Sequence, residues 1–496
     1  MFVTTFKGSL KSSGVSLKKN LVYNFLLSIS QMAFPLLSIP YISRVLNPSG
    51  IGSVSFIDSL TYYFIVIAEF GIVSYGIREV ARKRNDKAAL DKLVSELLSL
   101  HLITSLISII IYSVLVFFLY NKIGDSRLLL FSFSFLLVNA FSCEWYFWGT
   151  EKFQYITIRT LITRVLGLIS LFLLVNAPDD FIIYYGIICV SAILNILWNF
   201  KNMFSEVKLR FRRIDLKGHV RQVFTVYLIS LTYSVPLLLD NVLLGLLSTT
   251  AAVAYYAFAM KIVRISTALI TDSFLVFYPN AVHLIKEEKF ERSKFTFSFS
   301  SELIFLITIP MGFGFLLIAK DFTTFYLGEG HHIVATNLMI LCFLPFIKSF
   351  SLFLNKQVLM PYNKDGQILK SLVLGMLVYI IAAISFNSFV GSSGASIAIM
   401  LSEISVLTLN LVYVRRITGY IELIKASTFW QAFFSSLAFI PIIYWINSLF
   451  HDSIIKVVLA VSLCLLVYCF SLLKIFKNSI ARSLYESFLI RIQKSL

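Results

Sequence analysis

Long apolar blocks recur along the whole chain and limit its fold more than any other feature. The clearest blocks, each long enough to cross about 30 Å of hydrocarbon as a helix, are residues 21–42, 97–119, 128–148, 222–247 and 454–473. Of the 496 residues, 58% are hydrophobic and only 14% are charged. Helices satisfy their own backbone hydrogen bonds in lipid, and the sequence lacks the alternating segments of about ten residues that are typical of membrane barrels. We therefore predict an all-α integral membrane protein with about fourteen transmembrane helices.

The distribution of basic residues predicts the orientation of these helices. The predicted spans are residues 21–42, 53–76, 95–119, 128–148, 154–176, 180–200, 222–247, 251–282, 296–319, 332–354, 368–389, 393–414, 428–449 and 454–473. Basic residues near the ends of spans are counted with the adjoining loop, for example Arg159 with the loop 149–159. On this count the two termini and the loops on their side hold 34 of the 43 Lys and Arg residues, the opposite loops hold five, and four lie deeper inside spans. Because Lys and Arg collect on cytoplasmic loops, we expect both termini in the cytoplasm. The net charge of +17 is then explained by orientation, and we expect no nucleic-acid partner.

A weak internal repeat predicts the domain organisation. "PLLSIPYISRVLNPSGIGSVSF" from Pro35 aligns with "PLLLDNVLLGLLSTTAAVAYYA" from Pro236 at a constant offset of 201 residues; chance similarity of apolar runs is the alternative. Two lobes related by a parallel pseudo-repeat enclose a central cavity in several transporters. The predicted parts are a cytoplasmic N-terminal tail (1–20), an N-lobe of spans 1–6 (21–200), a basic cytoplasmic linker (201–221), a C-lobe of spans 7–12 (222–414), two C-terminal helices, spans 13–14 (428–473), and a cytoplasmic amphipathic tail (474–496).

Charged residues inside the predicted spans are the candidate functional residues, because a charge at mid-bilayer costs at least about 2.5 kcal/mol. At 100° per residue, Lys261, Arg264 and Asp272 share one stripe of the eighth span, which faces either a water-filled cavity or a self-paired structural cluster. The basic residues that we predict to bind substrate are Lys261, Arg264, Lys348, Arg164 and Arg44; for the last three, a side chain that reaches the membrane surface is the alternative. The acids that we predict to couple an ion or balance charge are Asp272, Asp240, Asp58, Glu144 and Glu302.

The motifs of the chain predict neither catalysis nor a cofactor. The sequence has no phosphate loop, no Gly-rich nucleotide fingerprint and no nucleophile elbow, and its six His residues show no metal-ligand spacing. The five cysteines lie in or beside apolar runs and are interpreted as small hydrophobic residues. We therefore predict no cofactor, no metal and no catalytic residue. Lys and Arg in a cavity without a nucleotide site favour an anionic substrate with a phosphate or pyrophosphate group.

Several segments resemble the Wzx-type flippases of polysaccharide repeat units, which belong to the multidrug/oligosaccharidyl-lipid/polysaccharide exporter superfamily. "PYISRVLNPSGIGSVSF" (40–56) and "FGIVSYGIREVAR" (70–82) resemble the N-terminal signature of that family. "EWYFWGTEKF" (144–153) resembles its motif after the fourth span, and "LDNVLLGLLSTTAAVAYYAFAMKI" (239–262) resembles its seventh and eighth spans. The chain departs from the family pattern at Asn47, Trp148 and Ala254, and none of these departures removes a charge.

The resemblance implies a transporter rather than an enzyme. It implies a flippase that moves undecaprenyl-pyrophosphate-linked oligosaccharide, an O-antigen or similar repeat unit, from the inner to the outer leaflet of a bacterial cytoplasmic membrane by ion-coupled alternating access. The expected partners are this lipid-linked oligosaccharide, membrane lipids and, as candidates, a polysaccharide polymerase and a chain-length regulator. Two alternatives stay open: a cation-coupled multidrug antiporter of the same superfamily, which would need acids to bind organic cations, and a membrane polysaccharide polymerase, which would need catalytic groups.

Overall fold

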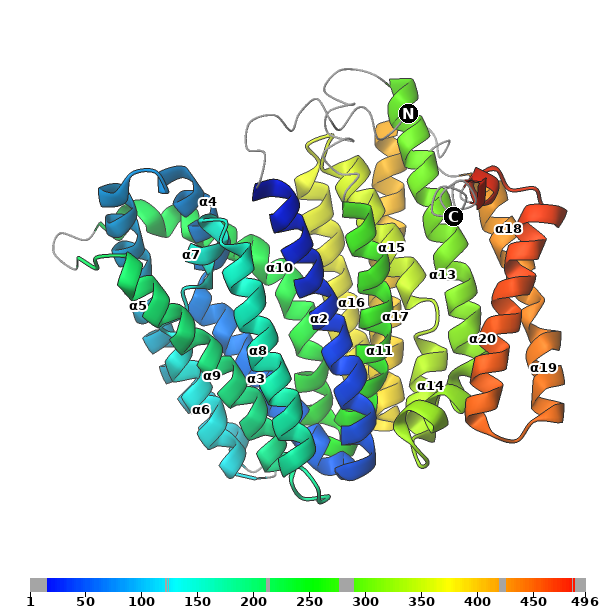
Figure 1. The fold of residues 1–496 in the computed structure, drawn as a ribbon, viewed down its shortest axis with the longest axis horizontal. Coiled ribbons are helices and arrows are strands. Elements are labelled where there is room, and N and C mark those ends of the chain that lie inside the picture. Colours follow the sequence, from blue (N-terminus) through cyan, green and yellow to red (C-terminus); the bar gives the residue numbers. More distant parts are fainter. Residues whose placement is uncertain are drawn as a thin grey trace. The chain divides into compact units, whose positions relative to one another are not determined.

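The computed structural model describes residues 16–120, 123, 125–210, 215–275, 290–418, 425–483 and 485–486. All regular elements in these ranges are helices, as predicted. They are α2 (Ser16–Val45), α3 (Pro48–Glu69), α4 (Ile72–Lys83), α5 (Lys87–Leu119), α6 (Arg127–Asn139), α7 (Glu144–Gly149), α8 (Phe153–Leu174), α9 (Phe181–Glu206), α10 (Lys217–Leu247), α11 (Thr250–Leu275), α13 (Phe290–Leu327), α14 (His332–Ile340), α15 (Leu344–Phe353), the π-helix η2 (Leu354–Leu359), α16 (Asp365–Val390), α17 (Ser392–Thr418), α18 (Ala426–Leu437), α19 (Phe439–Leu449), α20 (Ser453–Phe470) and the π-helix η4 (Ser471–Ile475) (Figure 1).

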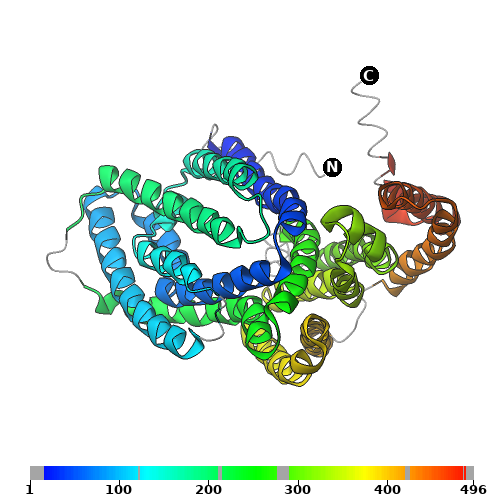
Figure 2. The ribbon, with the colours of Figure 1, turned by 90° about the horizontal axis from the view of Figure 1, so that it is seen from below.

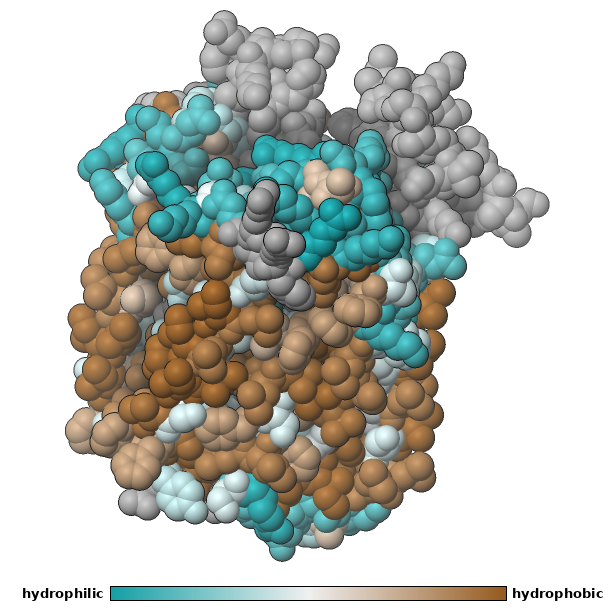
Figure 3. All heavy atoms as spheres, turned by 90° about the vertical axis from the view of Figure 1, so that its left-hand side faces the viewer, coloured by the Kyte–Doolittle hydropathy of each residue, from teal (hydrophilic) through white to brown (hydrophobic). Residues whose placement is uncertain are grey.

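Twelve of the described helical segments are long and apolar enough to cross a membrane. The face drawn in Figure 3 carries a broad apolar band between two hydrophilic ends, as expected for a surface in contact with lipid. The fourth and seventh predicted spans correspond to α6–α7 and to α10, which are not among the twelve. The multi-pass helical architecture is therefore confirmed, whereas the total of fourteen spans stays a prediction.

The chain divides into two compact units, Met1–Val242 and Leu243–Leu496. The division falls inside α10, later in the chain than the predicted basic linker, and the predicted domain bounds remain predictions. In the first unit, α3 packs on α5 and α6, and α8 packs on α2 and α9. Seen from below, these helices run side by side as a bundle (Figure 2).

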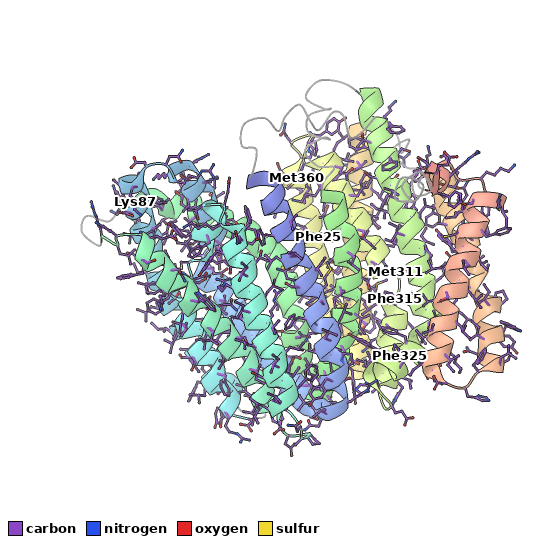
Figure 4. The ribbon with its side chains drawn as sticks, viewed as in Figure 1. Phe25, Lys87, Met311, Phe315, Phe325 and Met360 are labelled. Carbon is purple, nitrogen blue, oxygen red and sulfur yellow. The ribbon has the colours of Figure 1, made fainter. Side chains whose placement is uncertain are left out.

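The described part of the linker between α9 and α10 lies along α5. The backbone N–H groups of Arg210 and Asp215 donate to the Ser95 hydroxyl and the Glu96 carboxylate, at 2.8 and 3.1 Å. Lys87, at the first turn of α5 (Figure 4), donates to the backbone carbonyl of Glu206, where α9 ends and the linker begins. These contacts attach the linker to the first unit, so the described linker residues belong to that unit rather than to a free connection between lobes.

The second span ends earlier than the predicted range 53–76. Phe70 and Gly71 adopt φ values of 47° and 79°, and this left-handed pair separates α3 from the amphipathic helix α4. A Cβ atom at Gly71 would lie 2.6 Å from the backbone nitrogen of Tyr227. Only glycine fits this turn, because it adopts positive φ without a penalty and allows α10 to approach the backbone closely.

Each unit contains a broken helix, and the two breaks are 201 residues apart. In the first unit, α6 ends at Asn139 and α7 begins at Glu144; in the second, α14 ends at Ile340 and α15 begins at Leu344. The connections α2–α3 and α10–α11 also correspond at this offset to within about one residue. The coincidence supports the predicted pseudo-repeat, since chance similarity of apolar runs does not place helix breaks in register.

The C-terminal helices α18–α20 pack against α13 of the second unit. Their interface is a buried aromatic and aliphatic core that includes Phe305, Phe350, Phe439 and Tyr468. Buried aromatic side chains of this kind each remove a large apolar area from the surroundings. Of the predicted amphipathic tail, 474–496, only residues 474–483 and 485–486 are described.

Candidate functional site

Two arginines of α8 are held inside the first unit. Arg159 and Arg164 are five residues apart, so their side chains leave the helix about 140° apart and meet different neighbours. Arg159 contacts α7 and α9, whereas Arg164 contacts α2. The helix thus presents positive charge toward two parts of the same bundle.

Arg159 is the most deeply buried of these charges, with a side chain only 2% exposed. Its Nη2 lies 3.3 Å from Oε1 of Glu144 and donates to the Thr160 hydroxyl at 3.2 Å. Its Nη1 donates to the backbone carbonyl of Asn195 at a long 3.5 Å, and its Nε has no hydrogen-bond partner. The sequence analysis missed Arg159 by counting it with the inner loop, although the sixth residue of a span predicted to begin at residue 154 lies about 8 Å inside it.

Glu144 is a predicted acid that pairs with a buried base of the first unit, Arg159. It is the first residue of α7, directly after the helix break, and its side chain is 44% exposed. Besides the ion pair with Arg159, it interacts electrostatically with Arg164 and with Glu69 at the end of α3. Among the described contacts, Glu144 thus forms an ion pair with Arg159, whereas Arg164 donates to Ser30.

Arg164 lines a cavity of about 230 Å³ between α2, α8 and α9. Its Nη1 donates to the Ser30 hydroxyl at 2.5 Å, and Ser38 and Ser191 also line the cavity. A second, largely apolar cavity of about 380 Å³ lies between α6, α8 and α9, next to the place where Gly167 packs against Ser191. The structure thus places Arg164 at a cavity that a small polar group can enter.

The other predicted residues of the first unit lie elsewhere. Asp240 is buried and Asp58 is partly buried, on α10 and α3. Their chain neighbours Asn241 and Ser59 form a hydrogen bond of 2.9 Å that joins the two helices next to both acids. Arg44 is exposed in the last turn of α2.

In the second unit, Lys348 of α15 forms an ion pair with Glu403 of α17 at 2.8 Å. The Lys348 side chain is 31% exposed and that of Glu403 is 14% exposed. Asn410, about two turns beyond Glu403 on the same face of α17, donates to the Ser351 hydroxyl at 2.9 Å. The pair and this hydrogen bond connect the broken helix to α17 by polar contacts.

The remaining predicted residues of the second unit fall into two groups. Lys261 is exposed and Arg264 is partly buried on α11, while the side chain of Asp272, the third member of the predicted stripe, lies outside the described residues. Glu302 is buried in α13 and pairs with Lys425 at 3.0 Å, and it accepts a hydrogen bond from Thr428 at 2.9 Å. Glu302 therefore connects α13 to α18, through a lysine that was not in the predicted set.

Comparisons with known proteins bear on the family and the fold of the chain. The sequence pattern of the family described as "Polysaccharide biosynthesis protein" matches residues 17–285, more than half of the chain. Two proteins named "Putative O-antigen transporter" are similar along most of their length. The protein from Shigella dysenteriae is 25% identical over 395 residues, which cover 78% of this chain and 97% of the relative. The protein from Escherichia coli (strain K12) is 24% identical over 421 residues, which cover 82% and 98%.

Solved structures share the fold. A structure described as "Lipid II flippase MurJ, inward closed conformation" superposes with a TM-score of 0.71 at 15% identity and covers 93% of this chain and 100% of its own. An inward-facing multidrug resistance MATE family transporter of the MOP superfamily gives a TM-score of 0.55 at 14% identity, with coverage of 79% and 98%. These likenesses confirm the predicted all-α exporter fold.

Proposed function

The chain belongs to the polysaccharide biosynthesis protein family, and from this we propose that it flips a lipid-linked oligosaccharide across a bacterial cytoplasmic membrane. The proposed substrate is an undecaprenyl-pyrophosphate-linked O-antigen or similar repeat unit, which moves from the inner to the outer leaflet. The relatives named as O-antigen transporters and the likeness to a lipid II flippase support this substrate class. Alternating access of two lobes and cytoplasmic termini are part of the same proposal.

The observation that carries the proposal is the set of basic side chains held within apolar spans, above all Arg159, Arg164 and Lys348. Burial of these charges in a membrane is costly, so their presence calls for a functional partner. Arginine presents a planar group of donors that matches a phosphate or pyrophosphate group. An anionic head group that moves outward across an inside-negative potential gains about 2.3 kcal/mol per charge per 100 mV, which supplies a driving force without ATP.

A cation-coupled multidrug antiporter is the second candidate, favoured by Asp58 and Asp240 on neighbouring helices and by the likeness to a MATE family transporter. Acids inside a transporter bind organic cations or protons. The relatives named as O-antigen transporters favour the flippase.

The test is a strain that lacks this protein. Assembled lipid-linked repeat units trapped in the inner leaflet, with no surface polymer, would support the flippase. Single unpolymerised repeat units at the surface would identify a polymerase instead. Unchanged polysaccharide together with increased drug sensitivity would identify the antiporter, in a strain in which other flippase genes are also deleted.

The predicted stripe on α11 gives a sharper form of the test. The double variant Lys261→Ala/Arg264→Ala is expected to abolish surface polysaccharide while the protein level stays unchanged. Full export by this variant, at normal protein level, would remove both residues from the substrate path. Pull-down of a polysaccharide polymerase or a chain-length regulator with the tagged chain would test the candidate partners.

A further inference from the structure

Arg159 has fewer and weaker partners than a buried arginine normally has. A guanidinium group carries five N–H donors, and charge-assisted hydrogen bonds in proteins are usually about 2.7–2.9 Å long. The polar contacts of Arg159 are 3.2 to 3.5 Å long, and its Nε has none. Its guanidinium carbon also lies 5.9 Å from the centre of the Tyr155 ring, a cation–π contact that leaves the N–H donors unsatisfied. A buried charge that is this poorly satisfied points to a second anion that completes its hydrogen bonds.

Glu144 covers Arg159 from the accessible side. The carboxylate is 44% exposed while the guanidinium is 2% exposed, so an anion that approaches from outside this cluster meets Glu144 before it meets Arg159. The ion pair with Arg159 therefore holds the carboxylate in place, and its partial exposure leaves room for the Glu144 side chain to turn away.

The two arginines keep their positions through groups other than Glu144. The Arg164 guanidinium donates to Ser30 of α2, and the Arg159 guanidinium donates to Thr160 and to the Asn195 carbonyl. Thr163, between the arginines, exchanges hydrogen bonds with the Asn195 side chain at 2.9 and 3.2 Å. Glu144, in contrast, is the partly exposed first residue of α7, directly after a helix break. The next three side chains of α7 are buried, so release requires only a rotation of the Glu144 side chain while α7 and α8 stay in place.

We propose that Glu144 is an internal competitor for the head group of the substrate: it occupies Arg159 in the empty transporter and is displaced by a phosphate or pyrophosphate anion. The inference rests on the proposed function, because it assumes that the transported molecule carries such an anion. A carboxylate that competes at this site keeps the affinity for the anion low enough for release on the other side of the membrane. A site that bound the anion tightly in both the inward-facing and the outward-facing state would slow its release and would not speed transport.

The experiment measures binding of inorganic pyrophosphate to the purified full-length chain in lipid nanodiscs by calorimetry. Glu144→Gln removes the competing charge with little change of shape, and we expect pyrophosphate to bind about 5- to 50-fold more tightly. Arg159→Gln is expected to weaken binding at least about tenfold. Glu206→Gln is the matched control, because Glu206 pairs with Lys152 and accepts a hydrogen bond from Tyr146 rather than contacting either arginine. The affinity of this variant for pyrophosphate should equal that of the unchanged chain.

A transport readout separates competition from a merely structural role. Glu144→Gln is expected to lower surface polysaccharide in cells although it raises affinity, because release of the head group becomes slow. A structural bridge between α7 and α8 would instead give weaker binding together with a lower melting temperature. Glu144→Ala, measured in parallel, guards against an effect peculiar to the glutamine side chain.

Two negative outcomes are distinguishable. If the unchanged chain binds pyrophosphate and neither Glu144 variant binds it more tightly, the competitor role is wrong while the proposed function stands. If the folded, unchanged chain binds no pyrophosphate and the deletion strain makes normal polysaccharide, the proposed function itself is wrong.

Discussion

The two units place an ion pair beside a broken helix with the charges exchanged. In the first unit the broken helix supplies the acid, Glu144, and the neighbouring helix α8 supplies a base, Arg159, that is 2% exposed. In the second unit the broken helix supplies the base, Lys348, which is 31% exposed, and α17 supplies the acid, Glu403. The first pair hides its base behind its acid, whereas the second leaves its base accessible. Under the proposed function, an arriving anion would therefore contact Lys348 directly but would have to displace Glu144 to reach Arg159.

The largest effect should come from breaking the hidden pair at its base. Arg159→Gln leaves Glu144 without its ion-pair partner, and loss of one member of a buried charge pair typically costs about 2–5 kcal/mol. The variant also removes the planar guanidinium group that is proposed to bind phosphate. We expect surface polysaccharide to fall at least about tenfold when this variant is the only copy. Arg159→Lys, which keeps the charge but not the planar geometry, should restore only part of the export. Normal export by Arg159→Gln would show that the buried base is not needed.

Breaking the accessible pair should have a smaller effect. Lys348→Gln removes a lysine that is already partly solvated, so the lost interaction is weaker, and we expect export to fall about two- to fivefold. Glu403→Gln should leave Lys348 more available to an anion and therefore reduce export less than Lys348→Gln does. Quantitative surface-polysaccharide assays at matched protein level decide the order. An effect of Lys348→Gln larger than that of Arg159→Gln would reverse the assignment of the main anion site.

The sequence predicted the fold better than it predicted these pairs, for a physical reason. Hydrophobic length reports on the whole bilayer, so the approximate helix positions followed from it, whereas the exporter fold was predicted from the family resemblance. A charge near the end of a span, such as Arg159, has the same local sequence whether it faces the loop or the bundle, and only the packing of α7 and α9 decides. Glu302 shows the same limit for an acid. It was predicted to couple an ion or balance charge, but its partner Lys425 is 123 residues away in the chain, and the local sequence does not indicate such a distant pair.

A third comparison contrasts two glycines with positive φ. Gly71, at the α3–α4 turn, has φ 79° and a backbone nitrogen 2.6 Å from the place of a Cβ atom, whereas Gly330 has φ 88° and open space around it. Gly330→Ala meets only the backbone penalty of about 1–2 kcal/mol. Gly71→Ala adds a clash with the backbone of α10, so we expect a cost of about 2–4 kcal/mol in folding stability. Thermal unfolding of both variants in the same detergent measures the difference; equal melting temperatures would mean that α10 yields to the methyl group.

The smallest effect on stability should come from an exposed ion pair, which serves as the reference against which the effect of the buried pairs is compared. Arg127 Nη2 contacts Asp125 Oδ2 at 2.7 Å before α6, and the Arg127 hydrogen bonds lower the pKa of Asp125. Because the folded-state pKa is lower than the unfolded one, the pair stabilises the fold above the unfolded pKa and loses this contribution as the pH falls through the folded pKa. Exposed pairs are screened by solvent, so Asp125→Asn should change the melting temperature at neutral pH by about 1 °C or less, and the difference from the unchanged chain should shrink further in acid. If Asp125→Asn lowered the melting temperature at neutral pH as much as Arg159→Gln does, burial would not determine the strength of ion pairs in this protein. The contrast between the buried and the exposed pairs would then fail.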